Sequence, residues 1–314
     1  MRPKWLTIIL SGRQVAALVV SPNSLMRNST DPITELKALA AKHHLEPFSD
    51  GLLQHVQFAV GLTPQRSDDR EIPVGLNKLG GEPDVPPGFL WPMRKDRPLA
   101  FVAQINLGQI PAVPESKLPA RGILSFFYDD QVWGFDPEDK DGFKVYCFAD
   151  QALERIKTPV VKTKKKLFGI FPQSSSETKI YKSCKFEPKT IATLPDDAAV
   201  IGLPVDFTDD YCRMLEDMEG HHRLLGYCEP IQNPMQIECE LVTNGFYCGD
   251  SSGYKKASEF EETSKQWRLL LQIDSDIEHS DMMWGDGGRL YYWIKEKDLE
   301  SGNFQNCWLI SQCS

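Results

Sequence analysis

Residues 78–92, KLGGEPDVPPGFLWP, contain two adjacent glycines, four prolines and a tryptophan. Gly80 and Gly81 allow a positive φ or a close backbone approach, and the prolines fix φ and remove amide donors. The stretch predicts a rigid corner that leads into a strand. The alternative is a ligand or peptide groove, for which Gly81, Pro83 and Trp91 are the predicted binding residues.

The motifs of this corner and of the strands that follow occur twice in the chain. Each copy runs from LG-x-EP to an apolar strand ending in Gln-Ile-Asn or Gln-Ile-Asp, and then to Gly-x-Leu with aromatics. The matching segments are 78–83 and 224–230, 101–106 and 269–274, and 122–127 and 288–293. Three matches in one order indicate an internal duplication, with an insertion at about 231–265 in the second copy.

Strand signals dominate the regular segments. LAFVAQINL at 99–107 and GILSFFY at 122–128 are apolar runs typical of buried strands. Residues 31–43 predict a helix, because Asp31 is a good N-cap and Pro32 suits the first helical position. We therefore predict an α+β fold that is mainly antiparallel β, with two fused pseudo-equivalent repeats.

The predicted organisation is a single domain at 31–314, formed by interlocked repeats at about 52–150 and 195–310. Residues 1–30 are predicted to be a weakly ordered extension, and the basic, Ser-rich segment 160–178 a mobile loop.

Composition limits the classes of partner. The chain has 314 residues and a formal net charge of -9, which argues against general nucleic-acid binding. It lacks an apolar run long enough for a membrane-spanning helix, so no membrane partner is expected. The eight cysteines form no CxxC pair. This spacing disfavours a zinc site and is typical of reduced thiols in a cytoplasmic protein.

The segment 274–288 carries the densest cluster of acidic side chains. Asp274, Asp276 and Asp286 are oxygen donors of the type that calcium or magnesium takes, but the EF-hand spacing fails because His279 falls where glycine is required. A loop whose aspartates cap turns is the favoured interpretation, and no metal is predicted. With Trp284, the three aspartates form the second predicted binding surface, for a basic partner.

Gly249-Asp-Ser-Ser-Gly253 matches the nucleophile-elbow pattern G-x-S-x-G, with Ser251 as nucleophile and His279 later in the chain. That elbow needs a buried strand before the serine. The preceding residues 242–248 are a poor strand, broken by Asn244 and Gly245. The pattern is weak without this context, and we predict no catalytic residue.

The order of these motifs resembles the YwqG family over residues 52–307. The quoted segments are GLNKLGGEPDVPPGFLWP, LAFVAQINL, GILSFFYDD, WGFDP, HRLLGYCEPIQ, LLLQIDSD and MMWGDGGRLYYWIKEKDLESGNF. The resemblance implies a soluble intracellular protein with a mainly antiparallel β, α+β fold. It implies no catalytic residue and no cofactor, since none is defined for the family.

The corner and the Leu-Gln-Ile strand also resemble parts of the programmed cell death protein 2 group, which is linked to escorting a ribosomal protein. This second resemblance is partial, because the cysteine-rich metal-binding insert of that group is missing.

We therefore expect a non-enzymatic, intracellular protein-binding module with a protein partner held in the seam between the repeats. The alternative is an enzyme, either a hydrolase using Ser251 or one using an acidic metal site at Asp274, Asp276 and Asp286. A hydrolase requires His279 within hydrogen-bond reach of Ser251. A purely structural member of a larger assembly would instead expose a large apolar patch.

Overall fold

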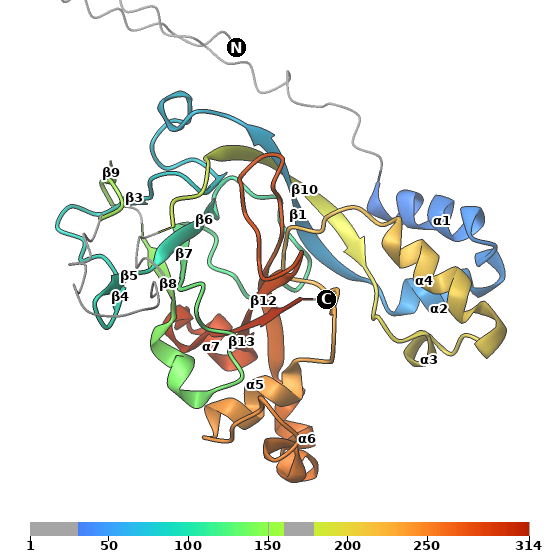
Figure 1. Ribbon diagram of the computed structural model, residues 1–314. Coiled ribbons are helices and arrows are strands. Elements are labelled where there is room, and N and C mark those ends of the chain that lie inside the picture. Colours follow the sequence, from blue (N-terminus) through green and yellow to red (C-terminus); the bar gives the residue numbers. More distant parts are fainter. Residues whose placement is uncertain (1–30, 150, 160–178, 314) are drawn as a thin grey trace, which may run out of the picture.

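The computed structural model describes residues 31–149, 151–159 and 179–313. Its main feature is a ten-stranded sheet with the order β14-β13-β12-β11-β1-β10-β2-β6-β7-β8 (Figure 1). Neighbouring strands are antiparallel throughout, so the prediction of a mainly antiparallel β fold is confirmed. The predicted extension 1–30 and the predicted loop 160–178 lie outside the described residues.

Two minor ribbons accompany the large sheet, β3 with β9 and β4 with β5. The strands of the large sheet are β1 (Gln57–Arg66), β2 (Lys78–Leu79), β6 (Ala100–Asn106), β7 (Ile123–Tyr128), β8 (Phe143–Phe148), β10 (Cys184–Thr193), β11 (Arg223–Leu224), β12 (Trp267–Asp274), β13 (Arg289–Lys295) and β14 (Trp308–Gln312). The ribbon strands are β3 (Asp84–Val85), β4 (Met93–Arg94), β5 (Arg97–Pro98) and β9 (Glu154–Arg155).

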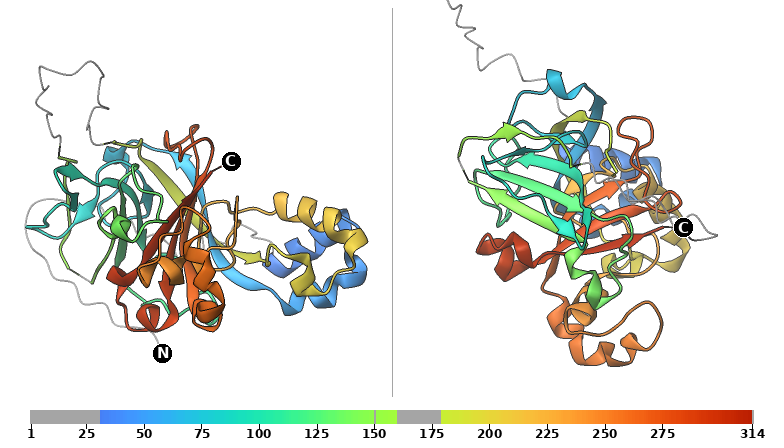
Figure 2. Two further views of the ribbon diagram at one scale, coloured as in Figure 1. Left: turned by 60° about the horizontal axis from the view of Figure 1, so that its bottom comes forward. Right: turned by 60° about the vertical axis from the view of Figure 1, so that its left-hand side comes forward.

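Helices lie in three places. Four of them gather at one end of the long β1–β10 pair and project away from the sheet (Figures 1 and 2). These are α1 (Pro32–Lys42), α2 (Ser49–Gln54), α3 (Ala198–Ile201) and α4 (Thr208–Glu216). Helices α5 (Gln236–Thr243) and α6 (Ala257–Ser264) occupy the predicted insertion, and α7 (Glu296–Glu300) follows β13. Short 3-10 turns are η1 (Glu46–Phe48), η2 (Asp69–Glu71), η3 (Pro137–Asp141), η4 (Val205–Phe207), η5 (Gly253–Lys256) and η6 (Phe304–Asn306).

Helix α1 forms where its capping signals predict it. The Asp31 carboxylate accepts from the Thr34 amide at 3.1 Å, Pro32 opens the helix, and Leu36 and Ala40 are buried against the neighbouring helices. No helix in the described part of the chain is long and apolar enough to span a membrane.

The sheet bends into a nearly closed, barrel-like shape in which its two ends approach each other (Figure 2). Aromatic rings fill the space between them: Phe126 on β7 lies 5.1 Å from Tyr292 on β13, measured between ring centroids. The Ser311 amide on β14 donates to the Trp133 carbonyl at 2.9 Å. The two ends of the sheet are therefore joined by packed aromatic rings and by a main-chain hydrogen bond.

The strand register shifts the alignment of segments 78–83 and 224–230 by one residue, because it makes Arg223, rather than Leu224, the counterpart of Lys78. Lys78 on β2 faces Gln104 on β6, and Arg223 on β11 faces Gln272 on β12. In both strand pairs the register shifts just before the glutamine. The shift lies between Phe101 and Ala103 on β6 and between Leu269 and Leu271 on β12. The hydrogen bonds of the two glutamine side chains extend this structural similarity to residues outside the strands.

The glutamine contacts correct the sequence comparison of the two corners. The Gln104 side-chain oxygen accepts from the Asp84 amide at 2.9 Å, and that of Gln272 accepts from the Glu229 amide at 2.9 Å. Asp84, rather than Glu82 of the LG-x-EP motif, therefore corresponds to Glu229.

Candidate functional site

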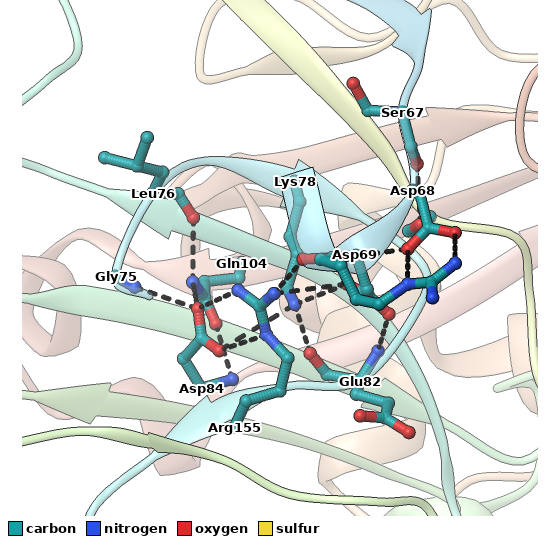
Figure 3. Close-up of polar contacts among 12 residues, drawn as sticks. Ser67, Asp68, Asp69, Gly75, Leu76, Lys78, Glu82, Asp84, Gln104 and Arg155 are labelled. Atoms are coloured by element: carbon teal, nitrogen blue, oxygen red, sulfur yellow. Dashed lines mark hydrogen bonds and ion pairs between the residues drawn. The ribbon is translucent and has the colours of Figure 1, made fainter. Parts of the chain in front are cut away.

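Each half of the sheet has a corner where a buried basic side chain meets a carboxylate, which is buried in the first corner and half-buried in the second. In the first corner, Lys78 and Asp84 are both fully buried. The Lys78 ammonium lies 2.9 Å from the Asp69 carboxylate and 3.9 Å from that of Asp84, and it donates to the Glu82 carbonyl (Figure 3). Arg155 on β9 covers the pair, with its Nε donating to Asp84 at 2.8 Å.

The charges of the first corner balance within the corner itself. Two cations, Lys78 and Arg155, face two carboxylates, Asp69 and Asp84 (Figure 3). Burial lowers the pKa of Lys78. Burial opposes ionisation of Asp84, but the hydrogen bonds from Arg155 and Gln104 and the charge of Lys78 hold its pKa below the usual value. This corner is a closed ion-pair network.

The second corner has an ion pair of the same kind, formed by a buried arginine and a half-buried glutamate. Arg223 has 4% of its side chain exposed and donates to two main-chain carbonyls and to the Glu229 carboxylate. The same carboxylate accepts from His221 Nδ1 at 2.9 Å, and Arg289 Nη1 lies 3.1 Å from it. Three cationic side chains thus converge on one glutamate.

His221 is specific to the second corner. The Gln272 amide donates to the His221 carbonyl at 2.9 Å, just as the Gln104 amide donates to the Leu76 carbonyl at 2.7 Å. His221 therefore occupies the position that Leu76 holds in the first corner.

Arg289 is specific to the second corner as well. It pairs with Asp274 across β12 and β13, whereas the matching pair across β6 and β7 is Asn106 with Ile123. An arginine thus stands where the first corner has a buried isoleucine. Arg289 also forms an ion pair with Asp274 at 3.2 Å.

A pocket of about 290 Å³ opens beside the second corner. Its polar wall holds the four side chains His221, Arg223, Glu229 and Arg289. The opposite wall comes from the end of β10 and from α4 with the residues after it. Its apolar members are Leu194, Leu215 and Met218, with Cys212, Cys228 and Pro230 beside them, and its exposed carboxylates are Asp196 and Glu216.

The electrostatics of the pocket favour a charged imidazole. The hydrogen bond to Glu229 raises the pKa of His221. Burial works against the ionised form of Glu229, but His221 and the two arginines hold its pKa below the usual value. Arg223, Arg289, Glu229 and Asp274 balance each other, so a protonated His221 adds one net positive charge to this wall.

Two donors in the pocket are not used by the protein. The contacts of Arg289 involve Nη1 and Nε, and the contact of His221 involves Nδ1. Among the described residues, nothing accepts a hydrogen bond from Arg289 Nη2 or His221 Nε2. These two groups border a pocket and are available to a ligand.

The predicted binding residues at the first corner have structural contacts. Gly81 has φ +74°, and a Cβ there would collide with the Asp69 carboxylate. The carbonyl of buried Pro83 accepts from the Ile156 amide at 3.1 Å. The Trp91 indole donates to the Leu99 carbonyl at 2.9 Å, and its ring packs on an aromatic side chain of β7. These contacts account for the Gly-Pro corner as a steric device.

The acidic loop between β12 and β13 is largely occupied by its own contacts. Asp274 pairs with Arg289, and Asp276 accepts from the amide and ring of His279, both at 2.9 Å. Trp284 is only 2% exposed and packs on Tyr128 and Tyr181, which corrects its prediction as a surface binding residue. Asp286 is exposed in the turn at 285–287 of this loop.

Neither enzymatic alternative gains support from the local geometry. Ser251 lies in the turn between α5 and α6, so a helix precedes it where the nucleophile elbow requires a strand. The His279 ring is bonded to Asp276 in a different loop. Within residues 31–149, 151–159 and 179–313, no three His, Cys, Asp or Glu side chains are placed to hold a metal ion.

A family model described as "Domain of unknown function (DUF1963)" matches residues 77–313. This range contains the second corner and every residue that lines the pocket, and it leaves out α1, α2, β1 and Asp69 of the first corner. A search of curated proteins found no match.

Proposed function

The chain belongs to this family of uncharacterised domains, and from that premise we propose that it is a non-enzymatic protein-binding module whose partner occupies the pocket beside Arg223 and Glu229. The observation that carries the proposal is the contrast between the two corners. The same kind of ion pair occurs twice, but Asp69 and Arg155 close it in the first corner. In the second corner it borders a pocket.

The proposal includes two fused repeats that arose by duplication. Its support is the matched register of Lys78 with Gln104 and of Arg223 with Gln272. The backbone conformation gives a second argument. Gly80 follows β2 and Leu225 follows β11, and both residues are left-handed, with φ of +60° and +65°. A non-glycine residue in that conformation is uncommon, which makes the agreement informative.

Two finer assignments are part of the same proposal. The family is proposed to be the one that the motifs resemble, YwqG, because nearly all of those motifs fall within residues 77–313. A cytoplasmic location is proposed because the eight cysteines are free thiols.

The pocket favours binding over covalent catalysis. Its basic side chains are paired with Glu229, and burial raises the pKa of the Cys228 thiol to about 12, so that thiol stays protonated at neutral pH. A protonated thiol is a poor nucleophile.

Filling the pocket tests the proposal. Cys212 is exposed on α4 and lines the pocket, so Cys212→Trp occupies the space without disturbing the core. Arg213→Trp is the matched control, because it places the same ring on the next residue of α4, outside the pocket lining. Both variants are compared with the wild type by affinity purification and mass spectrometry, after circular dichroism and melting have shown that they fold.

We expect a partner that is retained by the wild type and Arg213→Trp and lost by Cys212→Trp. An identical partner set for all three folded proteins would refute the assignment of the pocket. If no partner is found for any of them, an esterase screen and metal analysis test the enzymatic alternatives.

A further inference from the structure

Two unused donors stand close together on the polar wall of the pocket. His221 Nδ1 and Arg289 Nη1 approach the same Glu229 oxygen, at 2.9 Å and 3.1 Å, so their side chains converge from two sides. Their other nitrogens, Nε2 and Nη2, are left for a ligand. A guanidinium and an imidazolium together are suited to a carboxylate, because hydrogen bonds between charged groups are the strong ones.

We propose that the pocket binds the C-terminal carboxylate of a peptide whose last side chain is apolar. The inference rests on the proposed protein-binding function and names the ligand chemistry of that site. The carboxylate accepts from His221 and Arg289, and the last side chain packs on Leu194, Leu215 and Met218. A volume of about 290 Å³ is at the lower end for ligand pockets and is suited to the end of a chain.

The charges at the opposite wall select against an acidic stretch. Asp196 and Glu216 are exposed there and repel a second carboxylate. They attract a lysine or arginine that precedes the apolar end. The ligand is therefore a peptide with one terminal carboxylate and a basic residue upstream of it. A polyacidic segment does not fit these charges.

The first corner explains why the two donors are assigned to a ligand rather than to folding. Leu76 and Ile123 stand at the matching positions, and that corner keeps its buried ion pair without either donor. The first corner takes its second cation from Arg155 instead, so His221 and Arg289 are not part of what the two corners share. The variants His221→Leu and Arg289→Ile copy the first corner and are expected to fold.

Binding should weaken as the pH rises. His221 is faced by Glu229 on its own segment, by Arg289 on β13, by Asp274 on β12 and by Arg223 on β11. The paired charges cancel, so loss of the imidazolium proton removes the net positive charge of this wall. We expect about a tenfold loss of affinity between pH 6 and pH 9, the size of one charged hydrogen bond.

The experiment uses the full-length protein and two matched peptide pools. Both are short N-acetylated peptides of mixed sequence with a lysine before the last two residues and leucine at the end. One pool has a free C-terminal carboxylate and the other a C-terminal amide. Retained peptides are identified by mass spectrometry, and their affinities are measured by fluorescence polarisation with free leucine as a competitor.

The expected result is retention of the acid pool and not of the amide pool. His221→Leu and Arg289→Ile each reduce the affinity about tenfold or more. Arg268→Ile leaves it unchanged, because it removes an arginine from β12 outside the pocket lining. Folding of each variant is checked by thermal melting.

Three results would overturn the inference. Equal retention of both pools removes the role of the carboxylate. Free leucine that binds as tightly as the best peptide assigns the pocket to a free amino acid instead. Failure of both pools excludes a peptide C-terminus of this type. In each case the effect of Cys212→Trp on native partners still decides the proposed function separately.

Discussion

A buried glutamate in the inserted helices gives a pH dependence that can be calculated in advance. Glu238 on α5 is 8% exposed, and the Tyr254 hydroxyl donates to it at 3.1 Å. Burial raises its pKa from 4.5 to about 7. Because the folded protein binds this proton more tightly than the unfolded chain, the stabilisation is complete below the unfolded pKa and is lost as the pH rises through the folded pKa.

The size of the change in stability follows from the shift in the pKa of Glu238. A raised pKa of this extent is equivalent to about 3 kcal/mol once the pH is above the folded pKa. The loss develops gradually, to about 1 kcal/mol at pH 5, about 2 kcal/mol at pH 6 and about 3 kcal/mol at pH 7 and above. Glu238→Gln keeps the shape of the side chain and an acceptor for Tyr254 but has no proton to lose.

Urea unfolding of the wild type and of Glu238→Gln at pH 5, 6, 7 and 8 measures the difference. We expect the variant to gain about 2 kcal/mol on the wild type between pH 5 and pH 8. Glu261→Gln on α6 is the control, since it removes an exposed glutamate from the adjacent helix, and its profile should run parallel to that of the wild type. A constant difference between Glu238→Gln and the wild type over this pH range would show that Glu238 is not buried in its neutral form.

Three further predictions concern the corner and the first helix. Lys78→Met should lower the free energy of unfolding by about 3–5 kcal/mol in urea, because the Asp69 carboxylate loses its buried partner; a change below about 1 kcal/mol would contradict the network. Gly88→Ala should cost about 1 kcal/mol for its positive φ alone, since it has open space for a Cβ. Gly81→Ala should cost clearly more than Gly88→Ala by the same assay, and equal costs would remove the steric argument. Asp31→Ala should lower the stability by about 1 kcal/mol in thermal melting through loss of the N-cap of α1, and no change would mean that the cap is not formed in solution.

The strands were predictable from sequence because their signal is local. The apolar runs at 99–107 and 122–128 became β6 (Ala100–Asn106) and β7 (Ile123–Tyr128), buried along nearly their whole length. Of the four helices α1 to α4, only α1 was predicted from the sequence, because it has a strong N-cap. Helix α3 has only four residues, too few to show a helical period.

The pocket was beyond the sequence because its residues come from distant segments. As a rule, adjacent residues in a helix or strand do not face one site together. The histidine pair follows this rule: His221 bonds to Glu229, whereas His222 is buried and accepts from the Asp274 amide at 3.1 Å. That rule does not reveal which histidine faces a pocket. No sequence motif indicated a role for Arg289, because its position beside the pocket depends on its pairing with Asp274 between β12 and β13.

The two corners act as an internal control for the interpretation of buried charges. A buried ion pair is weak grounds for assigning function, because such pairs also occur where they only help to specify a fold. Both corners contain a lysine or arginine, an acidic partner and a glutamine. These residues are explained by a feature common to the corners, the packing of a short strand against the next strand. His221 and Arg289 occur in one corner only, and that corner borders a pocket. Function is therefore best sought in the side chains that distinguish the corners, and substituting these two by their first-corner counterparts separates binding from folding within one molecule.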